Sequence, residues 1–102
     1  MAVLSEEEIR DGLGRLTDWE WDSEAATIRR SVRLVGFLEA VALVNEVAQA
    51  AEQAGHHPDI DVRYDTVLLV LSTHDEGGVT EKDMALAARV DELVEGTARL
   101  KE

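Results

Sequence analysis

All three histidines of this chain lie between residues 52 and 83, with His56 and His57 adjacent and His74 further along. An imidazole ordinarily changes protonation near neutral pH, which suits it to proton transfer, and its nitrogens also bind metals. The chain has no cysteine, so thiolate metal sites, disulfides and cysteine nucleophiles are excluded. We therefore expect the chemistry of this protein in residues 52–83 and a scaffold elsewhere.

The adjacent histidines allow more than one interpretation. Neighbouring side chains diverge, so His56 and His57 suit two different atoms of one substrate better than joint ligation of one atom. Histidines completed by a carboxylate do hold catalytic metals, but helical ligand pairs usually stand at i, i+4 spacing, which disfavours a metal site here. A histidine pair in a surface turn also occurs without function. From the residues alone these alternatives stay open.

His74 and Asp83 each have an ordinary explanation as well. His74 ends an apolar run just before Gly77 and Gly78, where a side chain can point into a cleft at the rim of a sheet or simply be hydrogen-bonded there. Asp83 occupies the third position of a predicted helix, where a carboxylate caps the backbone and favours the helix dipole. The two glycines are turn residues, since no phosphate-binding GxGxxG or GxxxxGK loop is present.

Charge and composition limit the class of protein. The formal net charge is −12, from 22 acidic and 10 basic residues, so most of the surface would repel a phosphate backbone, and we expect no direct nucleic-acid binding. The opening MAVLSEEEIR lacks the basic and apolar regions of a signal peptide, and no apolar run approaches the roughly 20 residues that span a bilayer. These features favour a soluble cytoplasmic protein with no membrane segment.

The length predicts one domain, residues 1–102, because no linker-like stretch separates two cores. Hydrophobic residues make up 45% of the chain but aromatic residues only 4%, so the core must be built mostly from Val, Leu, Ile and Ala. Such a small core has little margin of stability, and association of subunits would help it.

The first part of the chain predicts a weak helix and a hairpin. Ser5 and Glu8 fit a capping box before apolar residues at helical spacing, although Gly12 and Gly14 weaken this helix, which should depend on docking. Residues 19–34 then read as two strands. The second strand carries an apolar set and a basic, hydroxylated set, and we expect the latter to be solvated: Ile28, Val32 and Leu34 against Thr27, Arg29, Ser31 and Arg33.

A long amphipathic helix is predicted over residues 36–54. Its apolar positions follow the i, i+3, i+4, i+7 spacing: Phe37, Ala40, Val41, Val44, Val47, Ala48 and Ala51. Gly55 stands where a left-handed C-terminal cap would end the helix, and Pro58 cannot continue it. The paired histidines should therefore lie at the exit of this helix.

A second hairpin and a last helix complete the chain. Residues 60–64 alternate in polarity, whereas residues 66–74 are apolar on both parities, which indicates burial on both faces. Thr80 and Asp83 resemble a capping box that opens the last helix. The order αββαββα predicts an α+β fold with a four-stranded antiparallel sheet and two long helices packed on one face, leaving the other face or an edge free for assembly.

The spacing of these residues resembles that of the pterin-4a-carbinolamine dehydratases. That family's pattern runs from a charged residue through HHP and an aromatic residue to a histidine and an aspartate, and the chain fills every slot: Glu52, His56, His57, Pro58, Tyr64, His74 and Asp83. The likeness extends to Trp19 and to the stretch THDEGGVTEKDMALAARVDEL. Departures at Gly55, Ile60 and Val79 remove no candidate acid or base and bear on pocket shape and on the preferred pterin side chain.

The resemblance implies the dehydration of 4a-hydroxytetrahydropterin to quinonoid dihydropterin and water, in pterin cofactor recycling, without metal or organic cofactor. It also implies a homodimer or homotetramer whose three histidines line the pterin pocket, supported by Asp83, Glu52, Pro58 and Tyr64. The reaction needs one proton delivered to the departing hydroxyl and another removed from a ring nitrogen. We expect His56 and His74 to exchange these protons while His57 orients the ring or shares the acid role.

The same resemblance allows a non-catalytic alternative. Proteins with this fold also serve as dimerisation cofactors of a transcription factor, and divergent relatives assist the assembly of a carbon-fixing enzyme. An interaction or assembly module on the same fold is therefore the second hypothesis, and the complete histidine pattern favours catalysis over it.

Overall fold

The computed structural model describes residues 2–97 and 100–101. Its elements follow the predicted order, with one additional 3₁₀ turn: α1 (Glu6–Leu13), β1 (Glu20–Asp22), β2 (Thr27–Arg33), α2 (Phe37–Ala54), β3 (Asp59–Arg63), β4 (Thr66–Leu71), η1 (His74–Glu76) and α3 (Glu81–Glu95). No helix in the described part of the chain is long and apolar enough to cross a membrane.

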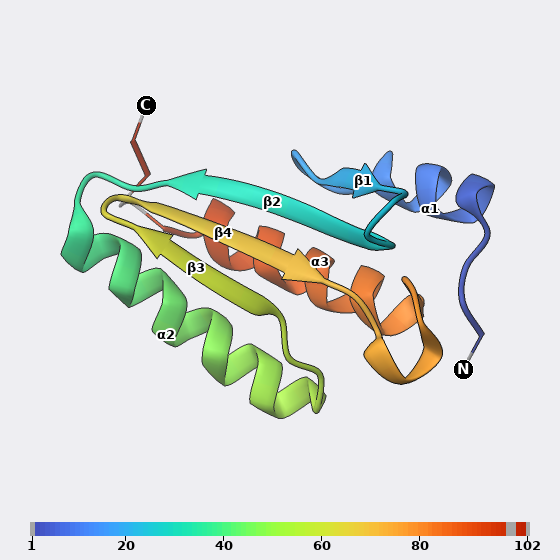
Figure 1. Cartoon of the computed structure of the whole chain (residues 1–102). Helices are drawn as coiled ribbons and strands as arrows, with labels where there is room; N and C mark the ends of the chain where they lie inside the picture. The colour runs from blue at the N-terminus through green and yellow to red at the C-terminus, as the bar shows by residue number, and fades with distance from the viewer. Residues whose placement is uncertain (1, 98–99, 102) are drawn as a thin grey trace.

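The four strands form one antiparallel sheet in the order β1-β2-β4-β3. The two long helices, α2 and α3, lie together on one face of this sheet, and α1 lies at the end near β1 (Figure 1). The α+β prediction is therefore confirmed. Because β3 and β4 form a hairpin and β4 pairs with β2, the ends of α2, β4 and the start of α3 come together at one end of the sheet.

Alternate residues of the two central strands face the helices. Val67, Leu69 and Leu71 of β4 are fully buried, and removing each such side chain from water contributes about 1.5–3 kcal/mol. On β2 the predicted alternation is confirmed, with Arg29, Ser31 and Arg33 exposed. Burial of both faces of β4 is not found: residues 68 and 70 are only half-buried, because no helix covers the outer face.

The buried stripe of α2 is rotated from its predicted position. Leu43 and Ala50 are buried, whereas Phe37 and Ala48 are exposed. The helix contacts both the sheet and α3, so its buried face is wider and lies partly beside the predicted stripe. The prediction followed hydrophobicity alone, which does not show how a helix is turned against two neighbours.

Helix α1 packs against the rest of the fold. Its capping box is confirmed, with the Glu8 amide donating to Ser5 Oγ at 3.1 Å and the Ser5 amide to Glu8 Oε1 at 2.9 Å. Gly12 is buried, and a Cβ built there would lie 3.1 Å from the end of the Met84 side chain of α3. Because glycine has no side chain, Gly12 permits the close approach of α1 to α3.

A buried carboxylate joins three parts of the fold. Asp91 of α3 accepts from Trp19 Nε1 at 2.7 Å, from the Thr17 amide at 2.8 Å and from Arg30 Nη1 at 2.6 Å. Arg30 lies on the inward parity of β2, between Ile28 and Val32, and is only 7% exposed. The ion pair offsets the burial of the guanidinium and fixes β2 and the segment before β1 to α3.

Candidate active site

The exit of α2 is built by a left-handed glycine. Gly55 has φ 62°, a conformation that side chains with a Cβ rarely adopt, and it ends the helix as predicted. The chain turns back at once, so the His56 amide donates to the Ala51 carbonyl at 3.1 Å. This turn directs His56 toward the start of α3.

His56 is held by a fully buried carboxylate. Its Nε2 atom lies 2.5 Å from Oδ1 of Asp83, which is 0% exposed, and the imidazole itself is 11% exposed. Asp83 stands at the third position of α3 and also completes the capping box with Thr80, as predicted. One side chain therefore serves both the helix cap and the histidine.

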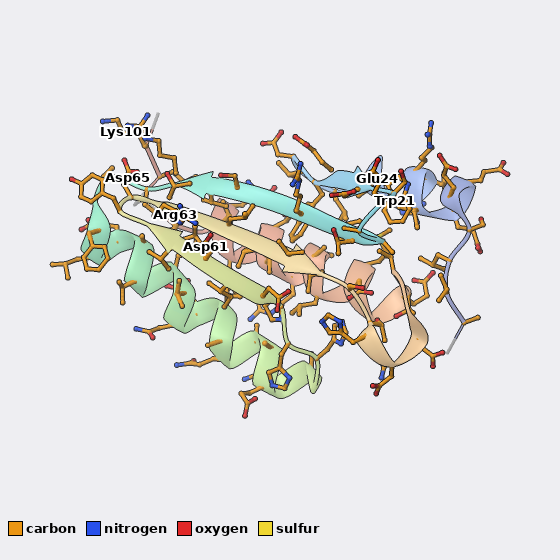
Figure 2. The ribbon with its side chains drawn as sticks, in the orientation of Figure 1. Trp21, Glu24, Asp61, Arg63, Asp65 and Lys101 are labelled. Atoms are coloured by element: carbon orange, nitrogen blue, oxygen red, sulfur yellow. The ribbon has the colours of Figure 1, made fainter. Side chains whose placement is uncertain are left out.

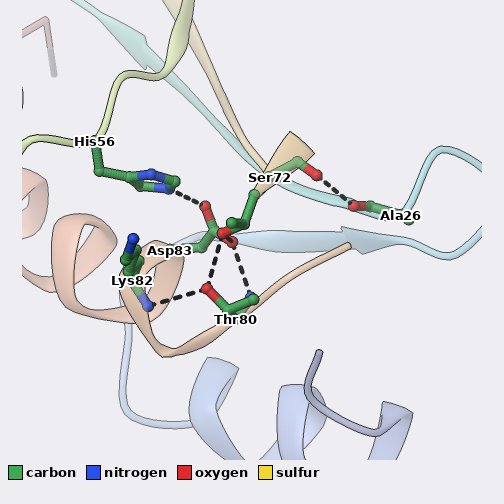
Figure 3. A network of polar contacts seen from close by, with 7 residues as sticks. Ala26, His56, Ser72, Thr80, Lys82 and Asp83 are labelled. Carbon is green, nitrogen blue, oxygen red and sulfur yellow. Dashed lines mark hydrogen bonds and ion pairs between the residues drawn. The ribbon is translucent and has the colours of Figure 1, made fainter. Parts of the chain in front are cut away.

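A chain of donors ends at Asp83 (Figure 3). Its Oδ2 accepts from the Thr80 amide at 2.9 Å and from the Thr73 hydroxyl at 2.8 Å. The Thr73 and Thr80 hydroxyls lie 2.8 Å apart, and Thr80 Oγ1 accepts from the Lys82 amide at 3.2 Å. The carboxylate of Asp83 thus acts as an acceptor throughout this network. The hydrogen in its contact with His56 therefore belongs to Nε2 of the imidazole, which leaves Nδ1 for proton exchange.

His57 faces a different partner. Its Nε2 atom contacts Oε2 of Glu52 from the last turn of α2, and both side chains are largely exposed, 63% for His57 and 77% for Glu52. An exposed pair of this kind contributes little to stability. His56 and His57 therefore have different carboxylate partners, a buried one for His56 and an exposed one for His57.

The three imidazoles line one pocket. His56, His57 and His74 surround a cavity of about 250 Å³. The other lining residues come from the helix exit, the segment after β4 and the start of α3: Gly55, Ser72, Thr73, Asp75 and Lys82. Among the residues that the structure describes, no three His, Cys, Asp or Glu side chains are grouped so as to hold a metal ion.

His74 reaches the pocket from a position that differs from the predicted one. Strand β4 ends at Leu71, and His74 opens the 3₁₀ turn η1, which closes at the left-handed Gly77. Thr73 ends the pairing by a backbone bridge to Gly78. The sequence analysis wrongly extended the strand to His74, because neither the Thr73–Gly78 bridge nor the 3₁₀ turn has a strong local pattern in the sequence.

None of the four predicted support residues lines the pocket itself: Asp83 and Glu52 contact the lining residues His56 and His57, whereas Tyr64 and Pro58 contact no lining histidine through a side-chain hydrogen bond in the described part of the chain. Tyr64 is 70% exposed in the β3–β4 turn, between Arg63 and Asp65, which Figure 2 shows at the far end of the hairpin. The five residues of β3 separate it from the histidine pair by roughly 17 Å, so the structure does not bring Tyr64 to the site. Pro58 follows His57, is half-buried, and leads the chain into β3.

Thr73 is a site residue that the sequence analysis did not identify. It is 7% exposed and links the end of β4 to the cap of α3 through Asp83. The only sequence signal is a hydroxyl residue upstream of Thr80 and Asp83, and such hydroxyls are too common to stand out. The resulting arrangement suits the exchange of protons with a small ring: three imidazoles, one of them fixed by a buried carboxylate.

Comparison with known proteins shows the family of this chain. The family model described as pterin 4 alpha carbinolamine dehydratase matches residues 2–93. A protein of Chloroflexus aggregans is 51% identical over 92% of this chain and 99% of its own length, and one of Mycobacterium sp. (strain KMS) is 45% identical over 93% and 99%; each has a provisional assignment as a pterin-4-alpha-carbinolamine dehydratase.

Solved structures show the same fold. The crystal structure of a transcriptional coactivator/pterin dehydratase from Brucella melitensis has a TM-score of 0.86 and 32% identity, and the match covers 90% of this chain and 98% of that one. A pterin dehydratase-like protein identified as a RuBisCO assembly factor in the alpha-carboxysome has a TM-score of 0.67 over 79% and 94% of the two chains, and at 22% identity it shows the fold alone. The chain belongs to the pterin 4 alpha carbinolamine dehydratase family.

Proposed function

We propose that this protein dehydrates 4a-hydroxytetrahydropterin to quinonoid dihydropterin and water, and so takes part in pterin cofactor recycling. The observation that carries this proposal is the pocket of about 250 Å³ lined by all three histidines of the chain. This pocket is smaller than the usual site of a drug-sized ligand, which suits a single fused two-ring heterocycle. Membership of the family supports the same reaction.

The reaction requires two balanced proton transfers. The bond between C4a and the hydroxyl oxygen breaks, and its electron pair leaves with the oxygen, which takes a proton from an imidazolium to become water. A lone pair on the adjacent ring nitrogen forms the new carbon–nitrogen double bond, and a neutral imidazole removes a proton from the ring. Each positioned imidazole would contribute roughly 10² to 10⁴-fold to the rate.

His56 and His74 are the proposed proton carriers. Asp83 holds the Nε2 proton of His56, so Nδ1 is the atom of that ring that would exchange protons with the substrate. His74 lines the same pocket from a different segment, the one that follows β4, whereas His56 follows α2. His57, steadied by Glu52 at the mouth, would orient the ring or share the acid role.

Stopped-flow dehydration of 4a-hydroxytetrahydropterin tests the assignment. We expect His56→Ala and His74→Ala each to lose roughly 10²-fold or more in kcat, whereas Arg15→Ala, on the exposed surface after α1, should keep the wild-type rate. Wild-type rates in both histidine variants would refute the assignment. Absence of dehydration by the unmodified protein would refute the function and favour the non-catalytic interaction module.

We also propose that copies of this chain associate into homodimers or homotetramers. Four large apolar side chains are more than half exposed: Val35, Phe37, Leu38 and Tyr64. The Leu34 amide donates to the Asp65 carbonyl at 2.7 Å, and Figure 1 shows the start of α2 beside the β3–β4 turn, so these four residues belong to segments at one end of the molecule. Exposed apolar clusters of this kind mark interaction sites.

Analytical ultracentrifugation tests the association. Leu38→Glu places a charge in the apolar cluster and should lower the sedimenting mass of the assembly. Gln49→Glu adds the same charge to an exposed position further along α2 and should leave the mass unchanged. A monomeric wild-type protein would contradict the proposal.

A further inference from the structure

A second cavity lies between α2 and α3, beside the histidine pocket. It has a volume of about 380 Å³ and an apolar floor made by Ala50 and Ala54 of α2 and by Ala85 and Leu86 of α3. His56 and Lys82 line both this groove and the histidine pocket. The two cavities are therefore neighbours that share the side chains of His56 and Lys82.

The rim of the groove is cationic in a strongly acidic protein. Lys82 and Arg89 line it together with Gln53, whereas no Asp or Glu lines it, although the chain has 22 acidic residues against 10 basic ones. Within residues 2–97 and 100–101, neither the Lys82 ammonium nor the Arg89 guanidinium is in an ion pair. These two charges are thus left free for a ligand.

The two cations are arranged along one line. Lys82 and Arg89 are two helical turns apart, so they lie on the same face of α3 at about 10 Å separation along its axis. Lys82 is next to the histidine pocket, and Arg89 lies further along the groove. The groove therefore has an apolar floor, one positive charge beside the histidine pocket and a second positive charge about 10 Å from the first.

We propose that this groove binds the substituent on C6 of the reduced pterin and favours a substituent that carries an anionic group. The inference rests on the proposed pterin dehydration and specifies its substrate class. The apolar floor suits a flat or apolar segment of the substituent, and the free cations suit a phosphate or a carboxylate. A short phosphorylated chain would reach Lys82, whereas a long aryl-linked glutamate would reach Arg89.

Dehydration rates of three 4a-hydroxy substrates test the groove. The substrates derive from 6-methyltetrahydropterin, from a tetrahydropterin with a short phosphorylated C6 chain, and from tetrahydrofolate. We expect a higher kcat/KM for at least one anionic substrate than for the methyl one. Relative to the methyl substrate, kcat/KM should fall roughly threefold to fivefold at low salt for tetrahydrofolate in Arg89→Gln, or for the phosphorylated substrate in Lys82→Gln. Arg15→Gln, which removes the same charge from the surface after α1, should change neither ratio.

The pattern across substrates identifies the source of the anion. A drop for tetrahydrofolate in Arg89→Gln supports a long carboxylate substituent, and a drop for the phosphorylated substrate in Lys82→Gln supports a short phosphate near the histidine pocket. Equal kcat/KM for all three substrates, or a preference for the anionic substrate that neither Arg89→Gln nor Lys82→Gln lowers, would overturn the inference while leaving the dehydratase function intact.

A binding measurement keeps the groove testable if no substrate is dehydrated. Folate, which carries the long carboxylate substituent on C6, and 6-methylpterin, which lacks it, are stable oxidised pterins that can be titrated against the full chain by calorimetry. Weaker binding of the carboxylate form to Arg89→Gln, with Arg15→Gln unchanged, would support the groove even though the dehydration had failed. Equal binding of both forms to all three proteins would overturn it.

Discussion

Nε2 of His56 and Oδ1 of Asp83 lie 2.5 Å apart, although 27 residues separate them in the chain. The contact joins the exit of α2 to the first turn of α3, and it does so through a carboxylate that is completely buried. A buried acceptor with three donors fixes both the position and the tautomer of the imidazole. In the proposed reaction Asp83 is therefore a positioning residue, since the substrate would meet His56 rather than the carboxylate.

Replacing Asp83 by Asn should reverse the tautomer of His56. The Asn oxygen can still accept from the Thr80 amide and the Thr73 hydroxyl, so its NH₂ would face His56 and require Nε2 to become an acceptor. The catalytic proton would then sit at the wrong nitrogen, and kcat should fall roughly tenfold to a hundredfold with little change in KM. Nitrogen-15 chemical shifts of the His56 ring would report the change directly.

Two controls separate positioning from damage to the fold. Asp83→Asn keeps the size and most hydrogen bonds of the side chain, so its circular dichroism spectrum should match the wild type. Glu52→Gln alters the exposed partner of His57 and should leave the tautomer of His56 unchanged. Unchanged nitrogen-15 shifts in Asp83→Asn would contradict the positioning role.

The left-handed glycine at the helix exit offers a test of site geometry. Gly55→Ala forces a residue with a Cβ to φ 62°, which should lower the free energy of unfolding by about 1–2 kcal/mol. It should also lower kcat/KM, because His56 and His57 follow directly. Gly96 ends α3 at φ −80°, an ordinary helical angle, so Gly96→Ala should be neutral or stabilise by up to about 1 kcal/mol. If urea denaturation gave the same change in the free energy of unfolding for Gly55→Ala and Gly96→Ala, the role of the left-handed backbone at Gly55 would be contradicted.

Local features of the fold are readable from the sequence, because their causes are local. Ser5 and Glu8, and Thr80 and Asp83, form the predicted capping boxes, and Gly55 ends α2 as predicted. These signals depend on backbone groups within a few residues. They were sufficient to place the histidine pair at a helix exit.

The remaining features depend on residues far apart in the chain. Thr73 meets Asp83 only because the β4 end and the α3 start converge in space, and Arg30 meets Asp91 across 61 residues. Arg30 alternates with apolar residues of β2, and its partner Asp91 cannot be identified before the position of α3 is known. Likewise the aromatic slot at Tyr64 matches the family pattern in sequence, whereas the five-residue strand β3 carries it away from the site.

The buried ion pair predicts a strong stability effect. Asp91→Ala leaves the Arg30 charge buried and also removes the acceptor of Trp19 Nε1, so the free energy of unfolding should fall by about 3–5 kcal/mol. Replacing both charged residues, as in Arg30→Met with Asp91→Leu, should recover part of that loss because no uncompensated charge remains. A double-mutant cycle measured by urea denaturation gives the coupling free energy between Arg30 and Asp91. If the losses of the two single variants simply added in the double variant, the predicted coupling would be contradicted.

Acid sensitivity should arise at the turn that joins β3 to β4. Arg33 Nε donates to Asp65 Oδ2 at 3.0 Å, and this hydrogen bond holds the pKa of Asp65 below its ordinary value. A pKa that is lower in the folded state stabilises the fold above the unfolded value of about 3.9. That contribution is lost as the pH falls through the folded pKa. Unfolding free energy measured from pH 6 downward should therefore decline less in Asp65→Asn than in the wild type, whereas Asp11→Asn, on exposed α1, should keep the wild-type slope.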